Sequence, residues 1–281
     1  MSIAVLINIH DGIVLAADSA STLTVMVPNQ PVPAVLNVYN NANKIANLLK
    51  GERIGCVAFG SGSIGSASIS TLLKDFRSRL ENGEEKAFKR DSYSMKDVAR
   101  FLLAFLVARI KDLQPGEAKP TLGIILGGYS KLSSLGEGWQ LAIENGEPKE
   151  LVLIRAEGNV GINWGGEYES LHRLILGFST RLLPTLAASM QPPPTPDQLA
   201  QLNTMLMTTL QAPVAFAPMP IQDAIDLAEW LVYTAEMFAR FVPGPTSVGG
   251  PIEVATITKH EGFKWIERKH YFGQQLNPEV K

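Results

Sequence analysis

The fold of this protein is decided by residues 1–19, which read MSIAVLINIHDGIVLAADS. Two apolar runs, 3–9 and 13–17, flank the pair Asp11-Gly12, which readily takes up the positive φ angles of a tight turn. The pattern predicts a β-hairpin that starts at the beginning of the sequence. Because the runs are apolar rather than strictly alternating, with Asn8 as their one polar residue, we expect the strands to be covered on both faces.

Ser2 stands directly before this hairpin and carries the most reactive chemistry that the sequence suggests. Initiator methionine is normally removed before a small side chain, so we expect Ser2 to become the amino terminus. It would then hold a hydroxyl and a free α-amine on one residue. An α-amine has a lower pKa than a lysine, so at neutral pH part of it can accept the hydroxyl proton. Ser2 is therefore a candidate nucleophile.

The composition is that of a globular protein with a large core. The chain has 281 residues, of which 46% are hydrophobic and 19% charged, and we expect one domain over 1–281. The net charge of -2 and the lack of Lys/Arg-rich runs argue against nucleic-acid binding. The single cysteine, Cys56, lies in an apolar run and is expected to be a buried small hydrophobe.

The sequence contains no segment that suggests a membrane protein. No apolar stretch approaches the roughly 20 residues of a membrane span, and the N-terminus lacks the pattern of a secretion signal. We therefore expect a cytoplasmic location and no membrane partner. His10, His172, His260 and His270 show no metal-ligand spacing and are expected at the surface, so we expect neither a metal nor a cofactor.

The rest of the chain divides into helical and strand-like segments. Apolar residues three and four apart predict helices at 69–80, 94–110, 167–183, 196–210 and 222–241. Apolar runs bounded by turn residues predict strands at 52–59, 121–126, 139–143, 151–155, 252–258 and 263–269. Two proline-containing segments, about 25–41 and 190–220, are interpreted as insertions, the first as a loop, and 272–281 as a polar tail.

The order of these segments indicates the fold class. Strands, two helices, strands, further helices and strands follow one another without the strict alternation that builds parallel sheets. Antiparallel pairing is therefore expected. We predict an α+β protein with two stacked antiparallel sheets between outer layers of helices.

Several stretches together resemble proteasome β-type subunits of the N-terminal nucleophile (Ntn) hydrolase superfamily, as in a divergent bacterial-type homologue. In that family a catalytic aspartate follows the nucleophile by sixteen positions, as Asp18 follows Ser2. The other matching stretches are Asn43-Lys44-Ile45, Ala58-Phe59-Gly60-Ser61-Gly62, 121–128 and 249–258. The resemblance implies a four-layer αββα Ntn-hydrolase sandwich.

The resemblance also implies roles for individual residues. Ser2 would attack a carbonyl, Asp18 would pair with Lys44, and Lys44 would favour the ionised hydroxyl. The Gly60 N–H would face the developing oxyanion. Implied in the same way are a peptide or protein substrate, a homo-oligomeric ring and an ATPase partner.

Substrate binding would fall to two further positions, Thr22 for an extended substrate backbone and Ala58 for the specificity pocket. The family has supporting polar residues on two later loops. Near 163–166 this sequence has no serine, and near 245–249 Ser247 is the accessory candidate by a one-residue shift.

Three functions remain open at this point. The first is an N-terminal nucleophile peptidase that uses Ser2 after Met1 removal. The second is a catalytically inactive proteasome homologue, a structural or binding subunit in which Asp18 and Lys44 form only a structural ion pair. The third is a small-molecule amidohydrolase on the same fold. A phosphate-binding loop at 60–65 is disfavoured because the Gly-Lys-Ser/Thr ending is absent.

Overall fold

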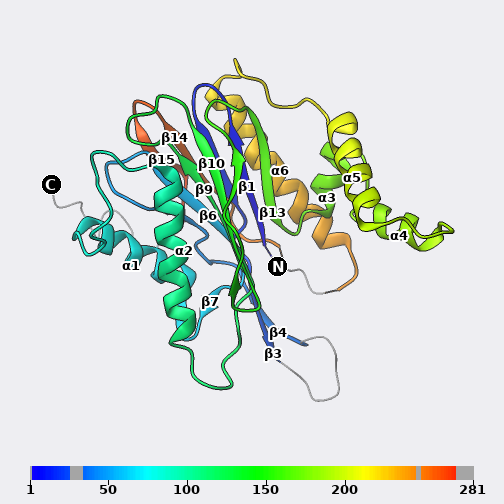
Figure 1. Ribbon diagram of the computed structural model, residues 1–281, viewed down its shortest axis with the longest axis horizontal. Coiled ribbons are helices and arrows are strands. Elements are labelled where there is room, and N and C mark those ends of the chain that lie inside the picture. The colour runs from blue at the N-terminus through cyan, green and yellow to red at the C-terminus, as the bar shows by residue number, and fades with distance from the viewer. Residues whose placement is uncertain (1, 26–33, 245–247, 270–281) are drawn as a thin grey trace.

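The computed structural model describes residues 2–25, 34–244 and 248–269 (Figure 1). Met1, the accessory candidate Ser247 and the expected tail 272–281 lie outside the described residues, as does part of the segment 25–41.

The predicted hairpin forms the centre of a five-stranded antiparallel sheet. Strand β1 (Ile3–Asn8) pairs with β2 (Ile13–Ala17) in the register that places Leu6 opposite Leu15. The sheet order is β13-β1-β2-β14-β15, with β13 at Gly161–Gly166, β14 at Glu253–Thr258 and β15 at Gly262–Glu267. All residues of β1 and β2 are buried, which confirms that both faces of the hairpin are covered.

A second antiparallel sheet lies against the first. Its order is β11-β10-β9-β6-β5, with β12 also paired to β10. The strands are β5 (Ile45–Asn47), β6 (Ile54–Gly60), β9 (Leu122–Gly128), β10 (Glu137–Glu144), β11 (Glu147–Pro148) and β12 (Val152–Arg155). Asn145 and Gly146 have φ angles of 49° and 81° and form the tight turn between β10 and β11.

Helices cover the outer faces of both sheets, so the α+β fold with four layers is confirmed (Figure 1). Helices α1 (Ile69–Glu81) and α2 (Met95–Lys111) pack on the second sheet. Helix α6 (Ile221–Phe241) packs on β1, β2 and β14 of the first. Between the sheets lies a third core, which includes Leu6, Leu15, Val57 and Ile125.

The helix starts follow the capping residues in the sequence. Ser94 Oγ accepts a hydrogen bond from the Asp97 N–H at the start of α2. Helix α5 (Pro196–Leu210) begins with a capping box between Thr195 and Gln198 and has proline at its first position. These caps satisfy backbone N–H groups that have no partner within the first turn of each helix.

The single helix predicted over 167–183 is wrong. The structure has a short α3 (Glu169–Leu171) and a π-helical turn η1 (His172–Leu176), which Gly177 ends with a φ of 78°. A separate helix, α4 (Leu182–Ser189), follows. Pro184 therefore does not close a helix but lies in the first turn of α4, where backbone N–H groups have no partner within the helix.

Several strands arise where none was predicted, and the longest of them are β13, β3 (Ser21–Val25) and β4 (Ala34–Tyr39). Strand β4 pairs with β3 and overturns the expectation of a loop at its residues. Short strands β7 (Ser63–Ile64) and β8 (Ala67–Ser68) lead into α1. Whether 25–41 and 190–220 are insertions stays a prediction.

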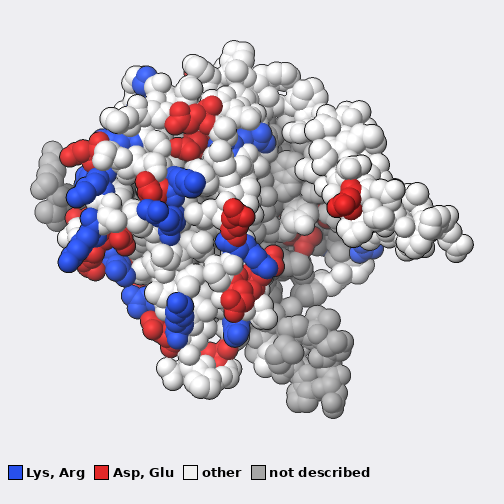
Figure 2. Space-filling model, viewed as in Figure 1, with Lys and Arg blue, Asp and Glu red and all other residues white. Residues whose placement is uncertain are grey.

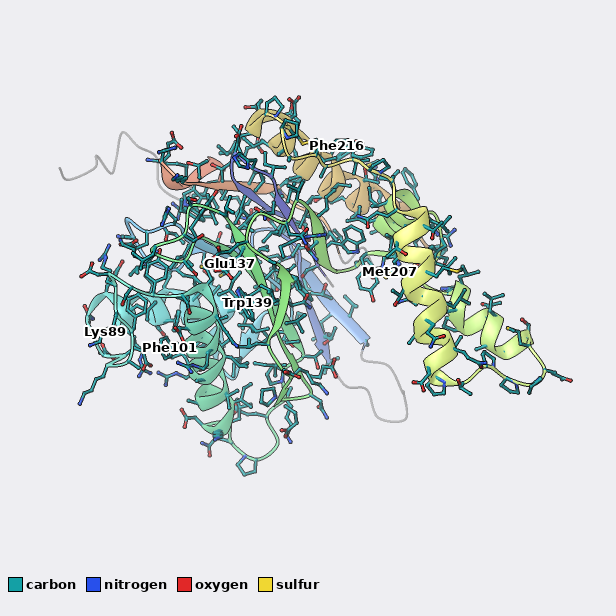
Figure 3. The ribbon with its side chains drawn as sticks, turned by 45° about the horizontal axis from the view of Figure 1, so that its top comes forward. Lys89, Phe101, Glu137, Trp139, Met207 and Phe216 are labelled. Atoms are coloured by element: carbon teal, nitrogen blue, oxygen red, sulfur yellow. The ribbon has the colours of Figure 1, made fainter. Side chains whose placement is uncertain are left out.

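Helices α4 and α5 form an arm that projects from the layered body (Figures 1 and 3). Among the described residues, none in either helix is buried. Figure 2 shows that charged side chains gather over α1 and α2, whereas the arm is almost uncharged on this face. Within the described ranges, no helix has the length and apolarity that crossing a bilayer requires.

Candidate active site

Ser2 is held at the start of β1 by its neighbour strand. Its carbonyl accepts a hydrogen bond of 2.7 Å from the Glu167 N–H, just after β13. A Cβ on Gly166, which has a φ of 98°, would lie 1.8 Å from the Ser2 carbonyl oxygen. Glycine at this position therefore lets β13 approach and fix Ser2, which is only 3% exposed.

Asp18, directly after β2, is a fully buried carboxylate with four hydrogen-bond donors. Oδ1 accepts from the Ile3 N–H at 2.9 Å and from Lys44 Nζ at 2.5 Å. Oδ2 accepts from the N–H groups of Ala20 at 3.0 Å and Gly249 at 3.1 Å. Charge-assisted bonds of this kind stabilise the ionised carboxylate and fix its position.

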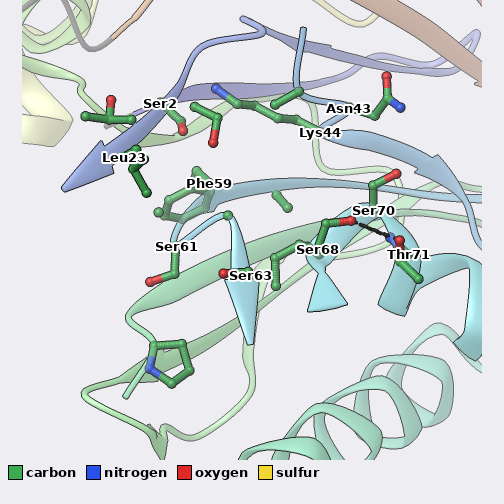
Figure 4. A pocket seen from close by; sticks show the side chains of 18 of the residues that line it. Ser2, Leu23, Asn43, Lys44, Phe59, Ser61, Ser63, Ser68, Ser70 and Thr71 are labelled. Carbon is green, nitrogen blue, oxygen red and sulfur yellow. Dashed lines mark hydrogen bonds between the residues drawn. The ribbon is translucent and has the colours of Figure 1, made fainter. Parts of the chain in front are cut away.

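Lys44 reaches the site from the residue before β5. Burial lowers the pKa of its ammonium, while the Asp18 carboxylate opposes this shift, and the balance is a pKa below the ordinary value. A lysine with a lowered pKa beside a buried carboxylate is the kind of group that functional sites use. Figure 4 shows the Lys44 side chain extending toward Ser2.

The direction of the Gly60 N–H follows from the hydrogen bonds of its neighbours Ala58 and Ser61. The Ala58 N–H donates to the Lys44 carbonyl at 2.9 Å, and the Ser61 N–H donates to the Thr121 carbonyl on β9 at 2.8 Å. Because successive N–H groups of a strand point to opposite sides, the Gly60 N–H points with that of Ala58, away from β9. On this side, before the start of β5, lies a cavity that Gly60 and Lys44 both line.

One cavity of about 760 Å³ brings most of the predicted site residues together (Figure 4). Ser2, Thr22, Lys44, Ala58 and Gly60 all line it. Its opposite wall carries a group of hydroxyl side chains, namely Ser61, Ser63, Ser68, Ser70 and Thr71. The cavity thus presents a hydroxyl, an ammonium and a backbone N–H to one volume.

Asp18 and Thr22 keep their side-chain oxygens buried rather than open to the cavity. Asp18 is fully buried and contacts the cavity through Lys44 rather than lining it. Thr22 lies on β3, and its hydroxyl oxygen is buried with no hydrogen-bond partner among the described residues.

A second buried ion pair beside the site was not predicted. Lys269 Nζ lies 3.1 Å from Glu253 Oε2 and donates to the Ala42 carbonyl at 2.9 Å and to Ser19 Oγ. Burial lowers the pKa of Lys269, and Glu253 opposes the shift. The signal in the sequence is Glu253, the one charged residue of β14, whereas Lys269 stands in a polar stretch and gives no signal.

The predicted burial of Cys56 is confirmed, whereas the predicted surface position holds for only some of the histidines. Cys56 is fully buried, and burial raises the pKa of its thiol, which confirms a packing role. His10 and His260 are exposed as predicted, and His270 lies outside the described residues. His172 is instead half-buried against three aromatic rings, so the surface prediction is wrong for this histidine.

Comparison with known proteins leaves the chain without an assigned family. No family model matches it, and no curated protein matches it. Among the solved structures it is similar to Anbu (Gly-1) mutant from Hyphomicrobium sp. strain MC1, with 13% identity, a TM-score of 0.49 and coverage of 96% of this chain and 86% of that chain. A likeness this distant assigns no activity, so function is argued from the site.

Proposed function

We propose that this protein is an amide hydrolase of the N-terminal nucleophile type, similar to proteasome peptidases, with Ser2 as the nucleophile after removal of Met1. The observation that carries the proposal is the cavity lined by Ser2, Lys44 and Gly60, with Lys44 held by the buried Asp18 carboxylate. These are the groups that acyl transfer requires, namely a nucleophile, a cation and an oxyanion donor.

The proposed reaction has two steps. Ser2 Oγ attacks the amide carbon while the Ser2 α-amine takes the hydroxyl proton, directly or through a water. The Gly60 N–H donates to the oxyanion, and the proton passes to the leaving amine as the C–N bond breaks. Water then attacks the acyl ester, so that an acid is released and the Ser2 hydroxyl is restored.

The proposed substrate is a peptide or protein segment in extended form. The exposed ribbon of β3 and β4 borders the cavity through Thr22, which supports binding of a substrate backbone alongside β3. Ala58 would contact the side chain that enters the cavity. An amide of a small molecule is the alternative substrate for the same chemistry.

The test is protein produced with ordinary Met1 processing. Mass spectrometry should show Ser2 as the first residue, and an electrophile that needs a free N-terminal nucleophile should add to Ser2 and not to a Ser2→Ala variant. A panel of peptides and small amides then assigns the substrate class. Retained Met1 together with an unlabelled Ser2 would exclude the proposed function.

A second candidate function is that of a catalytically inactive homologue with a structural or binding role. The observation that favours it is the absence of serine from 163–166, where the resemblance expects a supporting hydroxyl. Hydrolysis by the wild type that is lost in Ser2→Ala would exclude this alternative.

We also propose that the protein works as a homo-oligomeric ring in the cytoplasm, with an ATPase partner. The projecting arm supports an assembly because it exposes large apolar side chains such as Met205 and Leu210. Light scattering on purified protein should give a mass several times the 30.5 kDa of one chain. A mass of one chain would exclude the ring.

A further inference from the structure

Glu236 is an acidic residue on the buried face of helix α6. The residues of this helix that face the core are Ala224, Ile225, Ala228, Leu231, Val232 and Ala235. Glu236 follows Val232 by four residues and precedes the packed Ala239 by three, so it occupies the same stripe. A carboxylate therefore stands where the helix pattern calls for an apolar side chain.

The packing of α6 brings Glu236 level with the proposed site. At one end, a Cβ on Gly12 in the hairpin turn would lie 3.2 Å from the Ile221 side chain. Fifteen helical residues rise about 22 Å, and the six strand residues from Gly12 to Asp18 span about 20 Å. Since α6 packs along β1 and β2, Glu236 lies near the end of the hairpin that carries Asp18.

The alternation of side chains along β2 places Asp18 on the face of the first sheet that α6 covers. Val14 and Ala16 of β2 belong to the core beneath α6, whereas Leu15 and Ala17 face the second sheet. Asp18 continues the series of Val14 and Ala16. The Asp18 and Glu236 carboxylates therefore share one face of the first sheet.

The Glu236 carboxylate is poorly compensated. Its Oε1 is buried and accepts no hydrogen bond within residues 2–25, 34–244 and 248–269. Burial and the nearby Asp18 charge raise the pKa of Glu236 to about 7, and the Lys44 ammonium opposes this shift. A buried carboxylate without a full set of partners lowers the stability of the fold. Its presence beside Asp18 therefore calls for a role in the adjacent site.

Asp18 and Lys44 are the charged groups that act on Glu236, whereas Glu229, earlier on α6, faces Glu267 and Asp226. Strands β1 and β2 contain no titratable residue, and β14 contributes Glu253, which is paired with Lys269. On α3, Glu169 is bonded to Arg173 and Thr180. The group that Glu236 can influence is thus the pair of Asp18 and Lys44.

We propose that Glu236 is a positioning residue of the Ser2 site, whose negative charge keeps Lys44 in its ammonium form. Asp18 and Lys44 alone form a neutral pair, and burial of Lys44 favours its loss of a proton. Above about pH 7, where Glu236 is mostly ionised, this second carboxylate makes the cluster negative and opposes that loss. The inference rests on the proposed function for its purpose, but the charge of Lys44 can be measured without activity.

The experiment is competitive acetylation of Lys44 by acetic anhydride across pH, read by mass spectrometry. Only the neutral amine reacts, so the reaction reports the titration of Lys44, which lines the cavity that the reagent enters. In Glu236→Gln the titration midpoint should fall by about one pH unit, the effect of a unit charge about 10 Å away at an effective dielectric constant of about 20. Glu229→Gln, two turns earlier on α6, should leave it unchanged.

A midpoint that stays the same in Glu236→Gln and Glu229→Gln overturns the inference. Glu236→Asp keeps the charge and should keep the midpoint near that of the wild type, which a role in packing alone would not require. If Glu236→Gln does not fold, Glu236→Leu suits the apolar stripe and makes the same comparison. Ser2 labelling is scored separately, so a wild type without a Ser2 adduct rejects the proposed function while the Lys44 titration still decides the role of Glu236.

Discussion

Gly60 combines two constraints that can be separated by mutation. Its φ is 92°, and a Cβ would lie 2.5 Å from the Thr121 carbonyl oxygen, whereas Gly116 has a φ of 93° and nothing within 4 Å. Gly116→Ala should therefore cost only the roughly 1–2 kcal/mol of a left-handed conformation. Gly60→Ala should cost clearly more in urea unfolding, because backbone atoms must also move. Equal costs would contradict this account.

The ion pair of Lys44 and Asp18 should be important for stability whether or not the site is catalytic. Lys44→Met leaves a fully buried carboxylate without its cation, and the free energy of unfolding should fall by about 3 kcal/mol. This is at the lower end for a broken buried pair because three backbone N–H groups still bind Asp18. Lys149→Met, which breaks an exposed pair with Glu144, should cost less than about 1 kcal/mol in the same measurement.

Among single residues, a sequence motif identifies those whose spacing is shared with known proteins. Ser2, Asp18 and Lys44 were found in this way, and they lie together. Glu236 and Lys269 come from distant segments, and their meaning depends on which face of a helix or which strand end packs against Asp18. Periodicity alone does not give that information.

Among the elements, β13 shows why one strand was missed. Glycines weaken strands, so a stretch with Gly161, Gly165 and Gly166 was not predicted to be one. In the structure, Gly165 makes room for the Phe59 ring, Gly166 for the Ser2 carbonyl and Gly161 for the guanidinium of Arg155. These glycines permit close approach by other segments, which the local sequence does not reveal.

Glu169 links α3 to the start of the arm and should make that connection sensitive to acid. It accepts bonds from Ser179, Thr180 and Arg173, which lower its pKa to about 2. The stabilisation is complete above the ordinary pKa of a glutamate and is lost as the pH falls toward 2. Wild type and Glu169→Gln should therefore differ in urea midpoint at pH 7, and the difference should shrink as the pH falls from about 4.5 to 2.

Arg173→Gln provides the comparison for this element. It removes one of the donors to Glu169 but keeps the carboxylate, so its midpoint should lie between those of the other two proteins at pH 7. A difference between wild type and Glu169→Gln that does not change with pH would show that the Glu169 charge is not responsible.

For the whole molecule, the apolar hairpin and the order of segments were enough to predict two antiparallel sheets between helices. This succeeded because a strand buried on both faces requires a layer on each side. The arm was harder to predict, since the stripe of Leu199, Leu202 and Leu206 is typical of a core helix, yet α5 buries none of its described residues. A sequence pattern indicates an apolar face and not what covers it.

The projecting arm should be the first part of the molecule to be cleaved by a protease. Subtilisin is expected to cut in the exposed connection between α4 and α5, near 190–195, while the layered body stays intact. Trypsin is the matched control because no lysine or arginine occurs between Arg181 and Arg240. Intact-mass analysis of the fragments measures both, and early subtilisin cuts within the body would contradict the prediction.

The hydrogen bond from the Gly249 N–H to Asp18, 231 residues apart, has a consequence for the order of events during synthesis. The hairpin leaves the ribosome long before Gly249, so the carboxylate beside Lys44 gains this donor only after the intervening segments have been made. Long-range contacts of this kind form late in folding. The proposed site is therefore completed only after Gly249 has been made, and a shorter nascent chain carries Ser2 without the full surroundings of Asp18 and Lys44.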